Sequence, residues 1–177
     1  MNPVGEPTGI PIPRTRISSG SPYEPKIGFS RAVRIGSRIL VAGTAPIWPD
    51  GSCDPDPEAQ ARRCFDIIIA ALREAGAGPE HVVRTRMFLI SAGDAEAVGR
   101  AHGAVFRDVR PAATMVVVAG LLDPRWKVEI EAEAQADAAA AIATAVAKRP
   151  TSAAGSNRRS PRSLKSTPAS GASAYAE

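Results

Sequence analysis

The sequence has few of the residues that cross-link or metallate small proteins. Its 177 residues include two cysteines and two histidines, and Cys53 and Cys64 lack the clustered Cys/His spacing of a zinc site. A chain of this length buries roughly two-thirds of the surface that its unfolded form exposes, so a core needs neither disulfides nor a metal. We therefore expect one domain of ordinary size, with no metal and no cofactor.

The sequence also has no long hydrophobic run. Its longest uncharged stretch of small apolar residues, 138–147, is shorter than the ~20 residues of a membrane-spanning helix. No basic segment followed by an apolar stretch opens the chain. These absences, together with the scarcity of cysteine, favour a cytoplasmic protein that is neither secreted nor inserted in a membrane.

The net charge of +4 is unevenly distributed. Residues 148–177 hold six bases and one acid, whereas residues 1–147 hold 16 bases and 17 acids. The basic segment is too poor in apolar residues to offset its ordering entropy, and the first thirteen residues contain four prolines. We expect an extended N-terminal arm (1–15), a folded domain (16–147) and a disordered basic tail (148–177). Nucleic acid is expected to bind only weakly, through this tail.

Two segments have the periodicity of amphipathic helices. The first has Asp56 as N-cap and Pro57 at its first position, and Gly76 stops it. The second begins after Asp94 and ends before Arg110, because a residue that precedes proline disfavours the helical region. In the first helix the apolar face carries Ala61, Cys64, Phe65, Ile68, Leu72 and Ala75, and the opposite face carries Gln60, Arg62, Arg63, Asp66 and Arg73.

Strand character predicts a mixed α+β fold with the element order β-β-β-α-β-α-β-β. The consecutive valines Val116, Val117 and Val118 make both faces of one strand apolar. Two helices can cover one face of the sheet, so a second copy of the chain is the simplest cover for the other face. The strand ranges with this character are 32–35, 38–43, 82–90, 114–121 and 126–134.

The last predicted strand alternates apolar and charged residues. Glu129, Glu131 and Glu133 fall on one face, where like charges repel one another unless solvent or bases offset them. We expect this face to be solvated or to meet bases from another element or subunit. Arg86 is the base that best fits this pairing, although it could instead serve a ligand.

Six stretches of the sequence, in order, resemble the RidA (YjgF-like) family of reactive-intermediate deaminases, formerly described as endoribonuclease L-PSP. They are IGFSRAV (27–33), VAGTAP (41–46), PEAQA (57–61), VRTRMF (83–88), RPAAT (110–114) and KVEIEA (127–132). The resemblance implies a chorismate-mutase-like α+β fold with a mixed sheet and two helices on one face. It also implies a homotrimer with a central β-barrel and ligand clefts at the subunit boundaries.

The resemblance implies a site that lacks the arginine with which the family binds the substrate carboxylate. Deaminating members hold the substrate carboxylate with an arginine in a Pro-Ala-Arg-Ser segment, since a guanidinium can donate two parallel hydrogen bonds. Here the segment is 111–114, and Ala113 stands at the position of the arginine. Phe29 stands where the family has tyrosine, Ala42 where it has serine and Gly99 where it has asparagine.

Other candidate residues keep the family's chemistry. Glu129 matches the carboxylate associated with activating the attacking water, and Thr114 keeps a hydroxyl in place of a serine. Gly43, Thr44 and Met115 complete the candidate ligand-binding set with Phe29, Arg86 and Ala113. Gly43 would permit a close approach at a strand end. Each threonine could instead be an ordinary strand residue, and Glu129 could be a solvated carboxylate.

Three functions remain open on the sequence. The first is a homotrimer that binds a small metabolite, such as a 2-imino or 2-keto acid, without the standard 2-aminoacrylate deaminase activity. The second is a divergent enamine or imine deaminase, or a related hydrolase, in which Glu129 activates water. The third, RNA binding or endoribonuclease activity, lacks a basic patch with interleaved aromatics in the folded part, and His81 and His102 form no readable catalytic pair.

Overall fold

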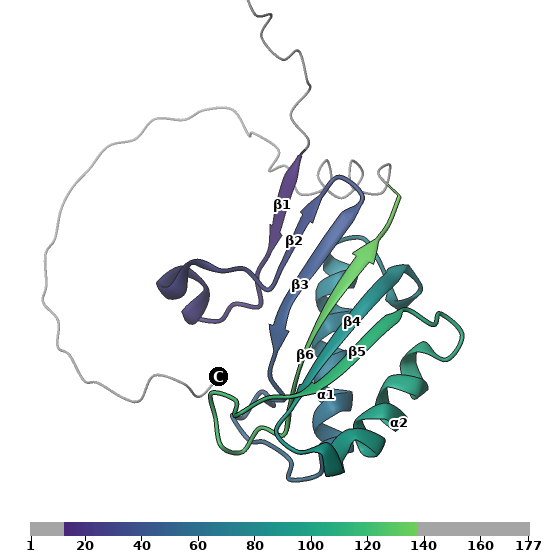
Figure 1. Ribbon diagram of the computed structural model, residues 1–177. Coiled ribbons are helices and arrows are strands. Elements are labelled where there is room, and N and C mark those ends of the chain that lie inside the picture. The colour runs from purple at the N-terminus through teal and green to yellow at the C-terminus, as the bar shows by residue number, and fades with distance from the viewer. Residues whose placement is uncertain (1–12, 138–177) are drawn as a thin grey trace, which may run out of the picture.

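The computed structural model describes residues 13–137, so residues 1–12 and the expected tail lie outside the described part. Six strands form one sheet in the order β1-β2-β3-β6-β4-β5, antiparallel except for the parallel pair β4 and β5 (Figure 1). The strands are β1 (Arg14–Ile17), β2 (Ala32–Ile35), β3 (Arg38–Thr44), β4 (Val82–Leu89), β5 (Ala112–Val117) and β6 (Val128–Gln135). The expected mixed α+β sheet is confirmed.

Helices α1 (Pro57–Glu74) and α2 (Ala95–Phe106) both lie on one face of the sheet (Figure 1). The Asp56 carboxylate accepts a hydrogen bond from the Ala59 amide at 3.0 Å, so the expected N-cap is confirmed. Gly76 adopts a φ of 77° directly after α1, which is the left-handed conformation that ends a helix. Among residues 13–137, no helix is long and apolar enough to cross a membrane.

The structure corrects several predicted boundaries. No strand range given above includes β1, which begins at Arg14 within the stretch expected to be an arm. The fifth strand ends at Val117 rather than at residue 121, because its parallel pairing with β4 ends there. The expected end of the second helix before Arg110 is confirmed, since α2 ends at Phe106 and Arg110, with a φ of 52°, lies outside the right-handed helical region.

The core lies between the sheet and the two helices. Phe65 of α1 and Phe106 of α2 are fully buried and meet edge to face, with their centroids 5.5 Å apart. Val128 and Ile130 of β6 are also fully buried beneath the helices. This packing fixes β6, and with it the outward-facing glutamates, in the middle of the sheet.

One residue predicted to lie on the outer face of α1 is buried. The Gln60 side chain donates hydrogen bonds to the carbonyls of Asp54 and Arg125 and accepts one from the Lys127 amide. Helical periodicity misplaced it because loops outside the sheet pack over the start of α1. These bonds anchor the chain just before β6 begins.

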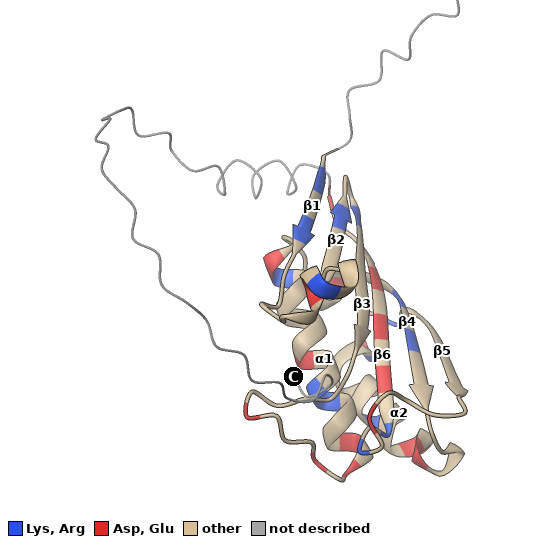
Figure 2. Cartoon of the chain, turned by 90° about the vertical axis from the view of Figure 1, so that its left-hand side faces the viewer, with Lys and Arg blue, Asp and Glu red and all other residues tan. Residues whose placement is uncertain are grey.

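The second face of the sheet is left open by residues 13–137. Leu40 and Val116 are 37% and 43% exposed on this face, and they share it with half-buried Phe88 and the β6 glutamates. Figure 2 shows red acidic positions along β6 and blue basic positions on β1, β2 and β4. The helices therefore bury one face completely, while the other mixes exposed apolar and charged groups.

Candidate functional site

The Glu129 side chain lies against the end of β3. The register between β3 and β6 shifts between Val41 and Thr44, and Gly43 lies within this irregular stretch. A Cβ atom at Gly43 would overlap a carboxylate oxygen of Glu129. The glycine thus allows the close approach expected at this position, although the approaching group is a side chain rather than a backbone segment.

A partly buried arginine holds the same strand end. Arg31 donates one hydrogen bond to Thr44 Oγ1 and one to the Gly43 carbonyl, both at 2.9 Å. Thr44 is fully buried, and its hydroxyl in turn donates to the Ala42 carbonyl. In this arrangement Thr44 supports Arg31 and β3 and does not face open space. Sequence reasoning did not single out Arg31, although the residue lies within the first matching stretch.

The electrostatic environment of Glu129 differs from that of a solvated carboxylate. Burial raises the pKa of Glu129, the positive charge of Arg31 lowers it in part, and the charge of Glu131 raises it further. No group within residues 13–137 donates a hydrogen bond to the Glu129 carboxylate. Glu129 is therefore a half-buried acid with unused acceptor capacity.

Glu129, Gly43, Arg31 and Phe29 line a cavity of about 510 Å³. A cavity of this size is within the range of small-molecule sites. Most of its other lining residues are apolar or aromatic, and they come from the π-helical turn Glu24–Gly28 and neighbouring loops as well as from α1. The aromatic members are Tyr23, Phe29, Trp48 and Trp126, which include both tryptophans of the chain.

A second arginine enters this cavity from α1. Arg63 donates from Nε to the Ile47 carbonyl at 2.7 Å, and its guanidinium lies 5.9 Å from the centre of the Trp48 ring. Trp126 also lines the cavity and is 6% exposed, and its indole N–H meets no acceptor among the described residues. Helical periodicity had placed Arg63 on the outer face of α1, and only the packing of the 45–49 loop over that face gives it a site role.

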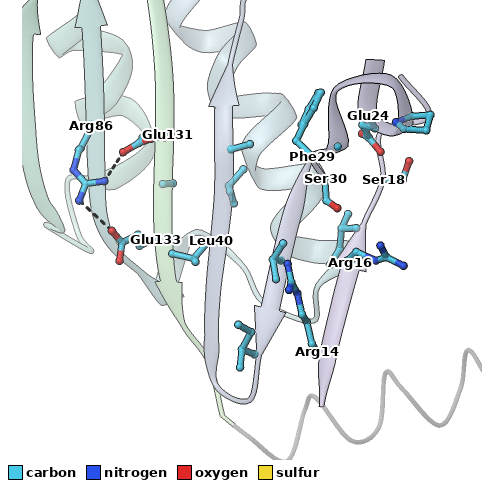
Figure 3. A pocket seen from close by; sticks show the side chains of 18 residues that line it. Arg14, Arg16, Ser18, Glu24, Phe29, Ser30, Leu40, Arg86, Glu131 and Glu133 are labelled. Carbon is cyan, nitrogen blue, oxygen red and sulfur yellow. Dashed lines mark hydrogen bonds and ion pairs between the residues drawn. The ribbon is translucent and has the colours of Figure 1, made fainter. Parts of the chain in front are cut away.

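The open face of the sheet forms a different hollow, of about 930 Å³ (Figure 3). Arg86 pairs there with Glu131 and, at 3.2 Å, with Glu133, and Arg38 also pairs with Glu133, at 2.9 Å. The predicted pairing of Arg86 with the glutamate row is confirmed. Arg86 lines this hollow and is not among the residues that line the Glu129 cavity.

The remaining candidate residues lie elsewhere in the chain. Ala113 and Thr114 are exposed on the edge strand β5, and Met115 packs partly against the core. None of the three lines the Glu129 cavity. Within one chain, the predicted site is therefore divided into two groups, because β4 lies between Glu129 on β6 and the three residues on β5.

Histidine and cysteine have structural roles, as the sequence indicated. His102 hydrogen-bonds Thr85 and contacts two phenylalanine rings, and His81 Nδ1 accepts a hydrogen bond from the Gly78 amide. The Cys64 thiol donates to the Thr44 carbonyl, and burial raises its pKa, so it is held as a thiol. No group of three or more metal-ligating side chains occurs in the described range 13–137.

This mixed sheet, with two helices on one face, has the architecture of YjgF proteins of known structure. Residues 20–136 match the family model described as Endoribonuclease L-PSP, and the chain belongs to this family.

In the similar proteins, the match covers most of the relative's own length. An uncharacterized protein of Streptomyces coelicolor is 44% identical over 116 residues, which are 65% of this chain and 87% of that protein. A RutC family protein of Pyrococcus abyssi is 34% identical over 95 residues, or 52% of this chain and 75% of that protein. The crystal structure of Rv2704 from Mycobacterium tuberculosis, a member of the YjgF/YER057c/UK114 family, is 41% identical with a TM-score of 0.64, covering 70% of this chain and 99% of that one.

Proposed function

We propose that the protein is a homotrimer that binds a small metabolite in clefts between subunits and lacks standard 2-aminoacrylate deaminase activity. The observation that carries this proposal is the division of the candidate site. Glu129 and Gly43 line one cavity, whereas Ala113 and Thr114 are exposed on the edge strand β5. A site that uses both groups needs β5 from a second subunit.

The open face of the sheet supports assembly. Val116 is exposed there beside Phe88, Leu40 is exposed farther along the same face opposite Glu133, and Val117 is 55% exposed at the β5 edge. Exposed apolar side chains in the middle of a sheet face are typical of protein interfaces, and closed cyclic symmetry is the usual way for identical chains to bury them. A trimer would also cover the unpaired edge of β5.

The loss of deaminase activity follows from the side chain at position 113. Ala113 offers neither a charge nor a hydrogen-bond donor, so a second subunit could not present an arginine from this position to the substrate carboxylate. The expected ligand is still a small metabolite such as a 2-imino or 2-keto acid, because the Glu129 cavity has the volume for one.

The test measures assembly and activity separately. Size-exclusion chromatography with light scattering should give three times the mass of one chain. Purified protein added to 2-aminoacrylate generated in situ should leave the rate of pyruvate formation at the uncatalysed level. Ala113→Arg should raise that rate, whereas Ala112→Arg, on the neighbouring exposed position of β5, should not. Pyruvate formation well above the uncatalysed rate with the wild-type protein would show that the protein is a deaminase. A mass equal to that of one chain would show that it is not a trimer.

One observation favours the second candidate, a divergent imine or enamine hydrolase. The raised pKa of half-buried Glu129 brings the carboxylate closer to the range in which a general base works near neutral pH. If this candidate is correct, wild-type protein turns over an imine substrate and Glu129→Gln abolishes the reaction. Equal rates for both proteins would eliminate Glu129 as the base.

A further inference from the structure

The Glu129 cavity contains a cation that the family's site pattern does not provide. Arg31 is not free to bind an anionic ligand, because its two terminal nitrogens already donate to Thr44 and Gly43 and its Nε is buried. Arg63 is different. Only its Nε donates to the protein, and its two terminal NH₂ groups have no acceptor among residues 13–137. Arg63 thus keeps a complete pair of donors for another group.

Two contacts fix the orientation of the Arg63 guanidinium. Its Nε is tied to the Ile47 carbonyl, and its plane lies near the Trp48 ring. A guanidinium restrained in this way loses little side-chain freedom when it binds a planar anion through both NH₂ groups. The helix neighbour Arg62 has no such role, since it pairs with Glu58 on the exposed side of α1.

The negative charge in the cavity does not neutralise Arg63. The charges that act on the carboxyl of Glu129 are those of Arg31 and Glu131. No ion pair joins Arg63 to any acid in the described part of the chain. The cavity therefore contains two charged groups that do not pair with each other, the guanidinium of Arg63 on α1 and the carboxylate of Glu129 on β6. Its other lining residues are mainly apolar or aromatic.

We propose that Arg63 binds the carboxylate of the ligand, and that the ligand is a small carboxylic acid with an apolar or aromatic body. This inference rests on the proposed function, because it takes the Glu129 cavity to be the metabolite site. Trp48, Trp126 and Phe29 supply the surface for the apolar body. The cation lost at Ala113 is thereby replaced from a different element of the fold, and the ligand binds in an orientation set by α1.

The experiment uses the full chain and a set of matched probes. 3-Phenylpropanoate carries the carboxylate and an aromatic body, 3-phenylpropanamide lacks the charge, and propanoate lacks the aromatic ring. Binding is followed by tryptophan fluorescence, since both tryptophans of the chain line the cavity, and is checked by calorimetry. Arg63→Gln is compared with Arg62→Gln, and thermal unfolding confirms that each variant folds.

We expect the wild-type protein to bind 3-phenylpropanoate at least tenfold more tightly than either the amide or propanoate. Arg63→Gln should weaken binding of the acid by about 10- to 100-fold, the factor associated with charge-assisted hydrogen bonds, and leave the amide unchanged. Arg62→Gln should change neither. Equal affinity for the acid and the amide, or equal losses in the two variants, would overturn the role of Arg63 while leaving a metabolite cavity in place. If none of the probes binds, both the role of Arg63 and the assignment of the Glu129 cavity as the metabolite site are wrong. The proposed trimer is tested separately, by the mass of the assembly.

Discussion

Glu129 and the pair Glu131 and Glu133 occupy one face of one strand, yet their surroundings give them opposite properties. On β4, Arg86 lies opposite Glu131, whereas Phe88 lies opposite Glu129. Hydrogen bonding from Arg38 lowers the pKa of Glu133, while burial raises the pKa of Glu129. The comparison shows that alternation along β6 determines which face a carboxylate occupies, and that the neighbouring strands determine its chemistry.

Replacing Arg31 should have the largest effect, because it removes the support of the Glu129 end of the strand. Arg31→Met removes the donor to the partly buried Gly43 carbonyl and to the hydroxyl oxygen of buried Thr44, and an acceptor left unmet inside a protein costs about 1–3 kcal/mol. We expect a loss of about 2–4 kcal/mol in the free energy of unfolding, measured with urea at neutral pH. Arg73→Met, at an exposed position of α1, is the control and should change little. Equal losses in both variants would mean that Arg31 does not hold β3.

Gly43→Ala should have the next largest effect. The added methyl group would occupy the space of a Glu129 carboxylate oxygen, so this side chain must leave its place against β3. Because the overlap involves the end of a flexible side chain, we expect a cost at the low end of the range for overpacking, about 1 kcal/mol, measured as a lower free energy of unfolding. Gly99→Ala, on α2 with open space around the new methyl group, should instead stabilise the protein by about 0.5–1 kcal/mol. Two substitutions with the same sign would contradict the steric explanation.

These contrasts also show where sequence reasoning succeeds. The α1 N-cap, the alternation of β6 and the pairing of Arg86 depend on local spacing, and the structure confirms each of them. The roles of Gln60 and Arg63 could not be predicted, because helical periodicity assigns them to an outer face that distant loops then cover.

The separation of the candidate site residues was also outside the reach of the sequence. Ala113 and Glu129 are both strand residues in matching stretches, but the spacing along the chain does not give the order of strands in the sheet. The order β6-β4-β5 places them two strands apart, and only the pairing pattern shows this. The sequence did contain a signal for Arg31. A charged residue lies there directly before the strand β2, inside a stretch that matches the family, and such a residue is a candidate for a structural hydrogen bond.

Glu129→Gln should change how stability depends on pH. Because the pKa of Glu129 is raised in the folded state, the native protein binds more protons than the unfolded one between the unfolded value of about 4.3 and the native value. Wild-type stability therefore falls as pH rises through this window. The variant lacks this fall, so its free energy of unfolding, relative to wild type, should be higher at about pH 8 than at about pH 4. Parallel pH profiles would show that Glu129 is not desolvated.

Glu133→Gln should give the smallest change, and with the opposite sign. Hydrogen bonding to Arg38 lowers the pKa of Glu133, so its contribution to stability is present above about pH 4.3 and is lost as pH falls through the native value. The variant should therefore lose slightly in stability at neutral pH and match the wild type in acid. Because Arg38 and Arg86 are accessible to solvent, about 1 M salt should screen this loss. The pH effect of Glu129→Gln should persist in the same salt, because burial causes it. If salt removed both effects, Glu129 and Glu133 would not differ in the cause of their pKa shifts.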